Sequence, residues 1–372
     1  MAPRPYYDDQ GRALPFDQVM QLEKIDDRTF RSVTKAYSPT GGENGTYGGH
    51  VYAQAVWAAA QTVDAGFLIH NVTGWFTLGG RPSEHFVYSV HKIRDGGNYC
   101  TRSVTVTQAA EKGTMFTCTC SFKREESSLV DYQDNCDIKA RFHDVLKGKE
   151  DDPMQHDAAP SQDSAFFRET YLPQHPEHFN PIAGLHLRKV DMRAYNDTRA
   201  PIDRRQLTFY SLRGELPLAT APHPIPLRGG FEMTREANLH ACAHLFASDR
   251  NSLFIIPNHL GRAREFSRMA SLAHTVIFHV GIRDLIMPPE PRIAHANAVP
   301  TLFEDGALPV CNLEGGRGDS DGRKWFVQES WVTRAAGGRG LHTSRMWDYE
   351  SGTHVATTMQ DGLVRFKAGA RL

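Results

Sequence analysis

The 372-residue sequence has no charge bias, no long apolar run and no paired cysteines. Its 42 basic and 43 acidic residues give a formal charge of −1, which argues against a nucleic-acid or anionic-membrane partner. No stretch approaches the roughly 20 apolar residues of a membrane span, and the first residues lack the apolar core of a signal peptide. The six cysteines lack zinc-type or disulfide-type spacing. We therefore expect an intracellular, reduced protein with buried free thiols.

One buried helix is predicted by residues 47–63 (YGGHVYAQAVWAAAQTV). After Gly48 and Gly49 the run contains no proline, glycine or charge, and its apolar residues cover most of a helical circumference. The two glycines allow a sterically tight entry and leave the first helical N–H groups free. We expect this helix to end near Gly66 and to form the centre of a domain.

Strand-like alternation with glycine turns follows the helix, from residue 69 to residue 122. This pattern predicts an antiparallel meander that wraps the helix, with a weaker edge strand at 30–37. The first domain is predicted at residues 1–125. Residues 126–198 are dominated by acidic residues, proline and histidine, which is typical of a linker over the surface.

The second half, residues 199–372, repeats this plan and indicates an internal duplication. A helix is predicted at 234–246, with Thr234 as its N-cap. An insert rich in proline and glycine is expected near 288–322. Strands are predicted at 206–213, 253–256, 271–279, 325–332, 340–348, 355–360 and 364–366.

Two short patterns have weak support as catalytic motifs. Gly318-Asp319-Ser320-Asp321-Gly322 matches the nucleophile elbow of serine hydrolases, but the preceding residues are polar and glycine-rich where a buried strand is required. The Asp-x-Asn-x-x-His run of hotdog hydratases and dehydratases is matched by Asp249 and Asn251, with Phe254 in place of the histidine.

Six marks in order make the chain resemble the acyl-CoA thioesterase II family. Three lie in the first half (residues 48–55, 94–96 and 121–122) and three in the second (246–249, 271–279 and 355–362). The resemblance implies an α+β double hotdog, two long helices each wrapped by an antiparallel sheet. It also implies hydrolysis of acyl-CoA, with no metal or redox cofactor, by a water that three side chains position, here Asp249, Ser271 and Gln360.

The chemistry of these three residue types fits that implied role. A carboxylate can accept a proton from water as general base, while a hydroxyl and an amide orient the water. Backbone N–H groups at the start of the first helix (Gly48, Gly49 and His50) are the candidate oxyanion and substrate-binding groups. The sequence departs from the family where an Asp-His-Ser run usually follows the hydroxyl residue, because Ala273 replaces the aspartate.

Two alternatives to the thioesterase remain, the first suggested by this departure and the second by the partial match at Asp249 and Asn251. One is a protein that binds acyl-CoA without hydrolysing it. The other is a hotdog hydratase or dehydratase that acts on an acyl thioester in a biosynthetic pathway.

The last three residues, Ala370-Arg371-Leu372, have the small–basic–leucine form of the C-terminal peroxisomal address. They predict a peroxisomal protein that an import receptor recognises. A homo-oligomer is also expected, because hotdog sheets often extend by pairing.

Overall fold

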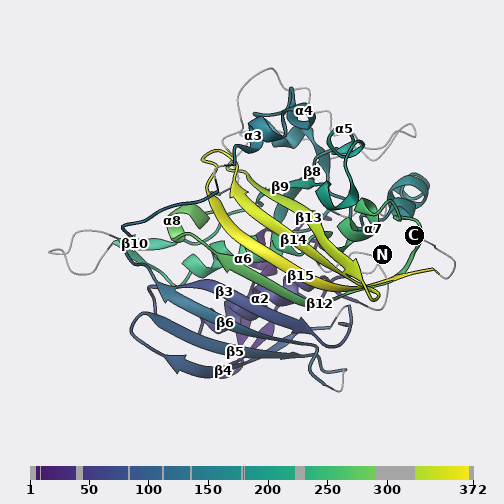
Figure 1. Ribbon diagram of the computed structural model, residues 1–372. Helices are drawn as coiled ribbons and strands as arrows, with labels where there is room; N and C mark the ends of the chain where they lie inside the picture. The colour runs from purple at the N-terminus through teal and green to yellow at the C-terminus, as the bar shows by residue number, and fades with distance from the viewer. Residues whose placement is uncertain are drawn as a thin grey trace.

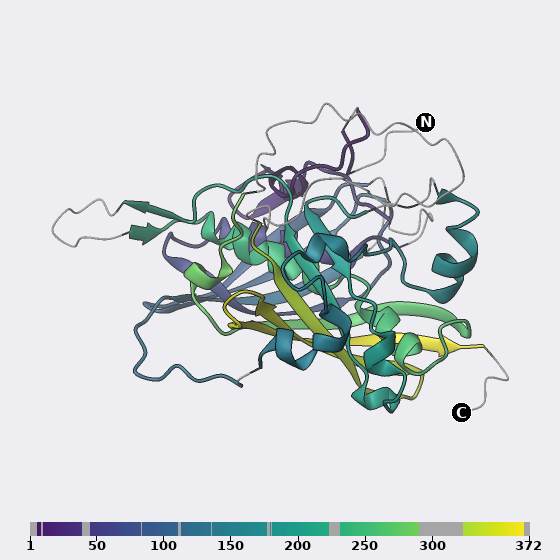
Figure 2. The same cartoon turned by 90° about the horizontal axis from the view of Figure 1, so that it is seen from above.

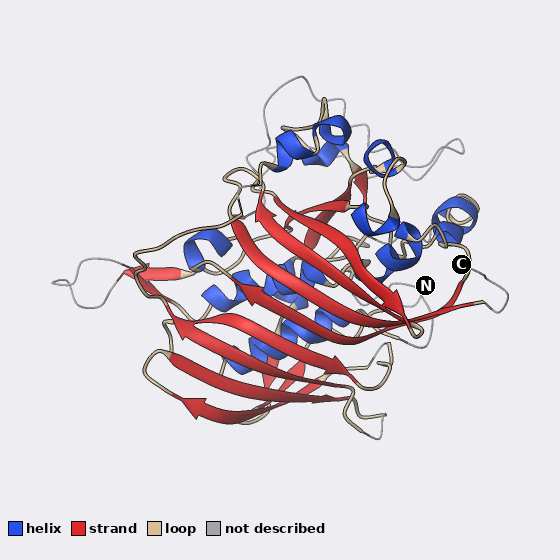
Figure 3. Ribbon diagram, viewed as in Figure 1, coloured by secondary structure: helices blue, strands red, loops and turns tan. Residues whose placement is uncertain are grey.

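The computed structural model describes residues 6–367, except 9, 39–44, 83, 111–112, 135, 177–178, 180, 223–230 and 290–322. One 13-stranded antiparallel sheet runs through the described chain, and two helices lie side by side against one of its faces (Figures 1 and 3). The predicted Gly318–Gly322 elbow, most of the predicted insert and the Ala370–Leu372 tripeptide lie outside the described residues.

The first of these helices, α2 (Gly48–Ala60), begins where the glycine pair predicted it. Its whole length except Gly48 and Trp57 is buried, as the apolar circumference indicated. The helix ends at Ala60 rather than near Gly66, which has a φ of +83° and follows a separate turn.

The second helix, α6 (Ala237–Ser248), is buried along its whole length and packs against α2. The two backbones approach closely, since the Cys242 Sγ lies 3.4 Å from the carbonyl oxygen of Ala53. A Cβ added at Gly49 would lie only 2.7 Å from the carbonyl oxygen of Phe246. Glycine at this position therefore permits the helix contact. The predicted N-cap was wrong: Thr234 lies before the helix and its hydroxyl donates to the carbonyl of Leu218.

The N-terminal half supplies six strands of the sheet, in the order β1-β2-β4-β5-β6-β3. The predicted meander is confirmed, and its two ends lie within two residues of the predicted ones. Its side chains alternate as expected, since Val104 and Val106 are buried against the helix while Thr105 between them is not. The predicted edge strand is shorter than expected. The six are β1 (Leu22–Lys24), β2 (Thr29–Ser32), β3 (Phe67–Phe76), β4 (Val87–Asp95), β5 (Tyr99–Thr107) and β6 (Phe116–Arg124).

The C-terminal half continues the same sheet, because β12 (Phe266–Phe278) pairs with β3 across the junction of the halves. The strand predicted at 253–256 was wrong: those residues form a 3₁₀ turn, η6 (Ser252–Phe254), and enter helix α7 (Ile255–His259). The other predicted strands are confirmed, as β9 (Gln206–Leu212), β13 (Phe326–Ala336), β14 (Arg339–Asp348) and the continuous β15 (His354–Phe366).

Residues 126–198 do more than cover the surface. Their strand β8 (Leu185–Lys189) pairs with β9, and β7 (Asp157–Ala158) pairs with β8 at the edge of the sheet. The same residues form the short helical segments α3 (Ile138–Arg141), α4 (His143–Leu146), η1 (Pro153–Gln155), η2 (Phe167–Tyr171) and α5 (Arg193–Asn196), of which Figure 1 shows α3, α4 and α5 near β8 and β9. The predicted linker is thus part of the sheet, and the proposed domain boundaries stay a prediction.

The remaining elements are peripheral to the sheet. A hairpin of two short strands projects from the body of the molecule (Figures 1 and 2). None of the helices in the described part of the chain has the length and apolarity that crossing a membrane requires. These elements are α1 (Phe16–Val19), η4 (Pro201–Asp203), β10 (Thr220–Pro222), β11 (Phe231–Met233) and α8 (Ile282–Leu285).

Candidate active site

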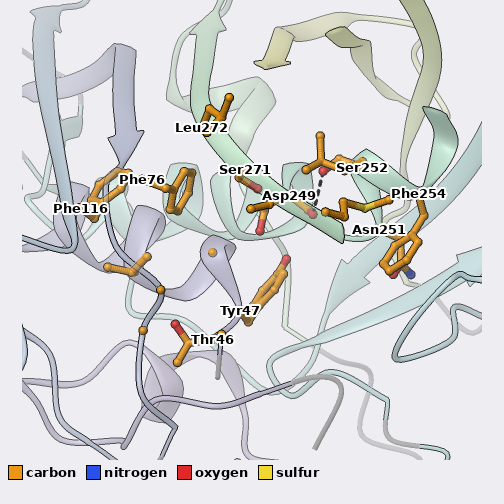
Figure 4. A pocket seen from close by; sticks show the side chains of 18 of the residues that line it. Thr46, Tyr47, Phe76, Phe116, Asp249, Asn251, Ser252, Phe254, Ser271 and Leu272 are labelled. Atoms are coloured by element: carbon orange, nitrogen blue, oxygen red, sulfur yellow. Dashed lines mark hydrogen bonds between the residues drawn. The ribbon is translucent and has the colours of Figure 1, made fainter. Parts of the chain in front are cut away.

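A cavity of about 530 Å³ lies between the start of α2, the end of α6 and the first part of β12. Both halves of the chain line it, so the site exists only where they meet. Apolar side chains form much of its wall, and Figure 4 shows Asp249, Ser271 and Ser252 close together on one side of it, with Tyr47 nearby. The apolar wall consists of Val51, Phe76, Leu78, Met115, Phe116, Leu253, Phe254, Phe266, Met269 and Leu272.

Asp249 is the C-cap residue of α6 and only 9% of it is exposed. Burial raises its pKa to about 6 because a carboxylate loses hydration in the interior. Hydrogen bonds from the Gln360 side chain and the Gly49 backbone N–H oppose that rise. A carboxyl group with this pKa is ionised at neutral pH and is still basic enough to take a proton from water.

Gln360 is fully buried in β15 and joins the other two predicted residues. Its Nε2 donates to Asp249 Oδ1 at 2.6 Å and to Ser271 Oγ at 2.9 Å. The three residues come from the end of a helix and from two neighbouring strands, and Asp249 and Ser271 lie 111 and 89 positions before Gln360 in the sequence. The structure therefore brings the predicted trio together.

A β-bulge in β12 explains how Ser271 reaches this group. Ser271 pairs with Gly362 and His274 pairs with Gln360, so β12 contains one residue more than β15 between these two pairs. Without the bulge, residues three apart in a strand would face opposite sides of the sheet. The extra residue turns both Ser271 and His274 toward the helices.

The glycine pair and His50 have different positions relative to the cavity. Gly48 lines it, and a Cβ there would lie 2.8 Å from Asp249 Oδ2. Gly49 directs its N–H to the Asp249 carboxylate. His50 is fully buried away from the cavity wall, where its ring contacts Tyr6 and Phe86. The structure thus places the two glycines at the site and His50 in the core.

Ser252 belongs to this group but was not predicted. It is 3% exposed, lines the cavity and donates a hydrogen bond from its hydroxyl to Gln360 Oε1. Its position three residues after Asp249, just beyond the end of a helix, was the available signal. The strand predicted at 253–256 concealed it.

The Ala273 departure lies outside the cavity. Ala273 pairs with Asp361 on one side and with Trp75 on the other, and Trp75 is 46% exposed. This is the sheet face opposite to Gln360, since successive strand residues alternate between the faces. The missing carboxylate therefore leaves the trio unchanged.

Three comparisons relate the chain to known proteins. The family model described as the acyl-CoA thioesterase N-terminal domain matches residues 35–123. The acyl-CoA thioesterase 2 of Haemophilus influenzae is 22% identical over 359 residues, which are 94% of this chain and 96% of the relative. The acyl-coenzyme A thioesterase 8 of Mus musculus is also 22% identical, over 96% of this chain and 90% of the relative.

Solved structures support the same fold over nearly the whole length. An acyl-CoA thioesterase II from Mycobacterium marinum has a TM-score of 0.56 at 22% identity, and covers 96% of this chain and 99% of its own. A hotdog protein from Alicyclobacillus acidocaldarius has a TM-score of 0.57 at 14% identity, over 94% of this chain and 97% of its own. The fold is a hotdog fold, and over nearly its whole length the chain is similar to acyl-CoA thioesterases.

Proposed function

We propose that the chain hydrolyses acyl-CoA to a free carboxylic acid and CoA, with the cavity holding the acyl thioester and Asp249, Ser271 and Gln360 positioning the water. The observation that carries the assignment is the Gln360 amide, which joins the carboxylate and the hydroxyl at the cavity wall. The apolar wall suits an acyl chain.

In the proposed mechanism Asp249 accepts a proton from the water while the water oxygen bonds to the thioester carbonyl carbon. The carbon–sulfur bond then breaks, and the proton passes to the sulfur to give the CoA thiol. Gln360 and Ser271 hold the reacting groups in line, which replaces part of the entropic barrier. The N–H of Gly48 at the start of α2 is the proposed oxyanion donor, because the N–H of Gly49 already donates a hydrogen bond to the Asp249 carboxylate.

The alternatives have less support from the site. A hydratase of the hotdog type needs an imidazole where this chain has Phe254, whose ring lies in the apolar wall 5.9 Å from that of Phe266. A protein that only binds acyl-CoA was suggested by Ala273, which lies on the other face of the sheet. Release of free thiol from a series of acyl-CoAs of increasing length tests hydrolysis directly. Binding without release at any chain length would favour the binding protein.

The pH dependence of hydrolysis should report the ionisation of Asp249. Because the general base must be ionised, kcat/KM should be level above about pH 7 and fall roughly tenfold per unit below the pKa of about 6. Initial rates between pH 5 and 8.5, with unfolding followed in the same buffers, would measure this. A level profile down to pH 5 in folded protein would contradict the role of Asp249.

We also propose a peroxisomal location from the Ala370-Arg371-Leu372 tripeptide. A fluorescent protein fused before the chain should colocalise with a peroxisomal marker, and removal of the tripeptide should leave it diffuse. Diffuse fluorescence from the full chain would contradict the address. Separately, we propose that the chain self-associates, as hotdog sheets often do by pairing, and sedimentation would measure this.

A further inference from the structure

We propose that Ser252 is a positioning residue that fixes the orientation of the Gln360 amide and so leaves the Ser271 hydroxyl hydrogen free to be donated into the cavity. The inference rests on the proposed function of Asp249, Ser271 and Gln360. It adds a fourth side chain and assigns a direction to the hydrogen bonds among them.

The Gln360 amide is engaged on every side. Its two N–H groups donate to Asp249 Oδ1 and Ser271 Oγ, and its carbonyl oxygen accepts from the Ser252 hydroxyl. A flipped amide would set its oxygen against the Asp249 carboxylate, and the Ser252 hydroxyl hydrogen would lose Gln360 Oε1 as its acceptor. The observed orientation is therefore the one that satisfies all three partners, and Ser252 anchors its oxygen end.

The direction of these bonds determines what Ser271 can do. Since Ser271 Oγ accepts from Gln360, its own hydrogen remains for another acceptor. Ser271 also lines the cavity, where the thioester carbonyl would lie. Ser271 is thus a hydrogen-bond donor to the carbonyl oxygen or the bound water, while Asp249 alone takes the proton.

The backbone around Ser252 explains how its hydroxyl reaches Gln360. Asn251 has a φ of +56°, and no other non-glycine residue within the described ranges has a positive φ. This left-handed residue reverses the chain directly after the end of α6, and its Nδ2 donates to the carbonyl of Pro160 at 2.9 Å. The Ser252 Oγ then lies 3.1 Å from the carbonyl oxygen of Asp249 as well as against Gln360. Asp249 and Ser252 are held on one short loop.

A double-mutant cycle separates positioning from a purely structural role. Ser252→Ala should lower kcat roughly tenfold to a hundredfold with KM nearly unchanged, because the amide is no longer anchored. In a Gln360→Ala background the same change should alter kcat less than about threefold, since there is no amide left to orient. An equal loss in both backgrounds, or no loss in the first, would overturn the proposal.

Ser252→Thr is the matched variant that keeps the hydroxyl. It should retain most of the wild-type kcat, which gives a result even if the alanine variant unfolds. A threonine variant that folds, by thermal unfolding, but has the kcat of the alanine variant would contradict the proposal. If Asp249→Asn and Gln360→Ala keep wild-type rates, the proposed function itself fails. If they lose activity and Ser252→Ala does not, only the role of Ser252 fails.

Discussion

Replacing Asp249 by asparagine should lower kcat for acyl-CoA hydrolysis by about 10²- to 10⁴-fold, the range that a general base contributes. Asparagine keeps the size of the side chain and cannot accept the proton of the attacking water. KM should change little, because the lost interaction belongs to the transition state. Thiol release at saturating acyl-CoA measures the effect, and a kcat within threefold of wild type would exclude Asp249 as the base.

The same variant should remain folded, which distinguishes lost chemistry from lost structure. The pKa of Asp249 is raised to about 6 in the folded protein from its ordinary value of 3.8. Its contribution to stability is therefore complete below about pH 4 and is lost as pH rises through about 6. At pH 8 the buried charge costs the wild type up to about 3 kcal/mol, a cost that asparagine avoids. Denaturant unfolding at pH 5 and pH 8 should show the variant gaining stability relative to wild type at the higher pH.

The strands of the first half were predictable because their pattern has a period of two. In β5, Cys100, Val104 and Val106 are buried while Thr105 and Thr107 are less so, and glycine turns mark the ends of the run. The α2 helix was predictable for a related reason, since a run that is apolar all round must be buried. Both features are local, and the sequence carries them directly.

The predictions that were wrong concern features that depend on contacts between residues distant in the sequence. Residues 253–256 form a short apolar run whose period cannot separate a strand from a buried helix, and tertiary packing made it helical. The strand β8 has too few residues to stand out from the polar segment around it, and it exists because β9 offers an unpaired edge.

The proposed catalytic trio was inferred from the family resemblance, whereas its geometry was not accessible from the sequence. Two backbone features were not predicted from the sequence. One is the β12 bulge that turns Ser271 inward, and the other is the left-handed Asn251 that precedes Ser252 and its hydrogen bond to Gln360. His50 differs from the two glycines, because its backbone N–H donates to the carbonyl of Tyr47 at 3.3 Å. It follows the glycine pair directly, but one helical residue further on points its side chain into the core.

Replacing Gln360 by alanine should lower kcat by roughly 10²-fold or more, because Asp249 and Ser271 lose the amide that holds them together. The removal also leaves the Ser252 hydroxyl without its side-chain acceptor in a buried site. Met359→Ala is the matched control, since the neighbouring residue of β15 is 43% exposed and absent from the cavity wall. The control should hydrolyse acyl-CoA at the wild-type rate.

Gln360→Glu tests the same position by charge rather than by size. A second carboxyl group 2.6 Å from Asp249 Oδ1 would share a proton with it, because two like charges at that separation cannot both ionise. The acid limb of the pH–rate profile should therefore move above the wild-type value of about 6, with low activity at pH 7 that recovers partly at higher pH. Two carboxyl groups at this distance must titrate together. An unchanged acid limb would therefore show that the side chain at position 360 does not contact Asp249 in the active enzyme.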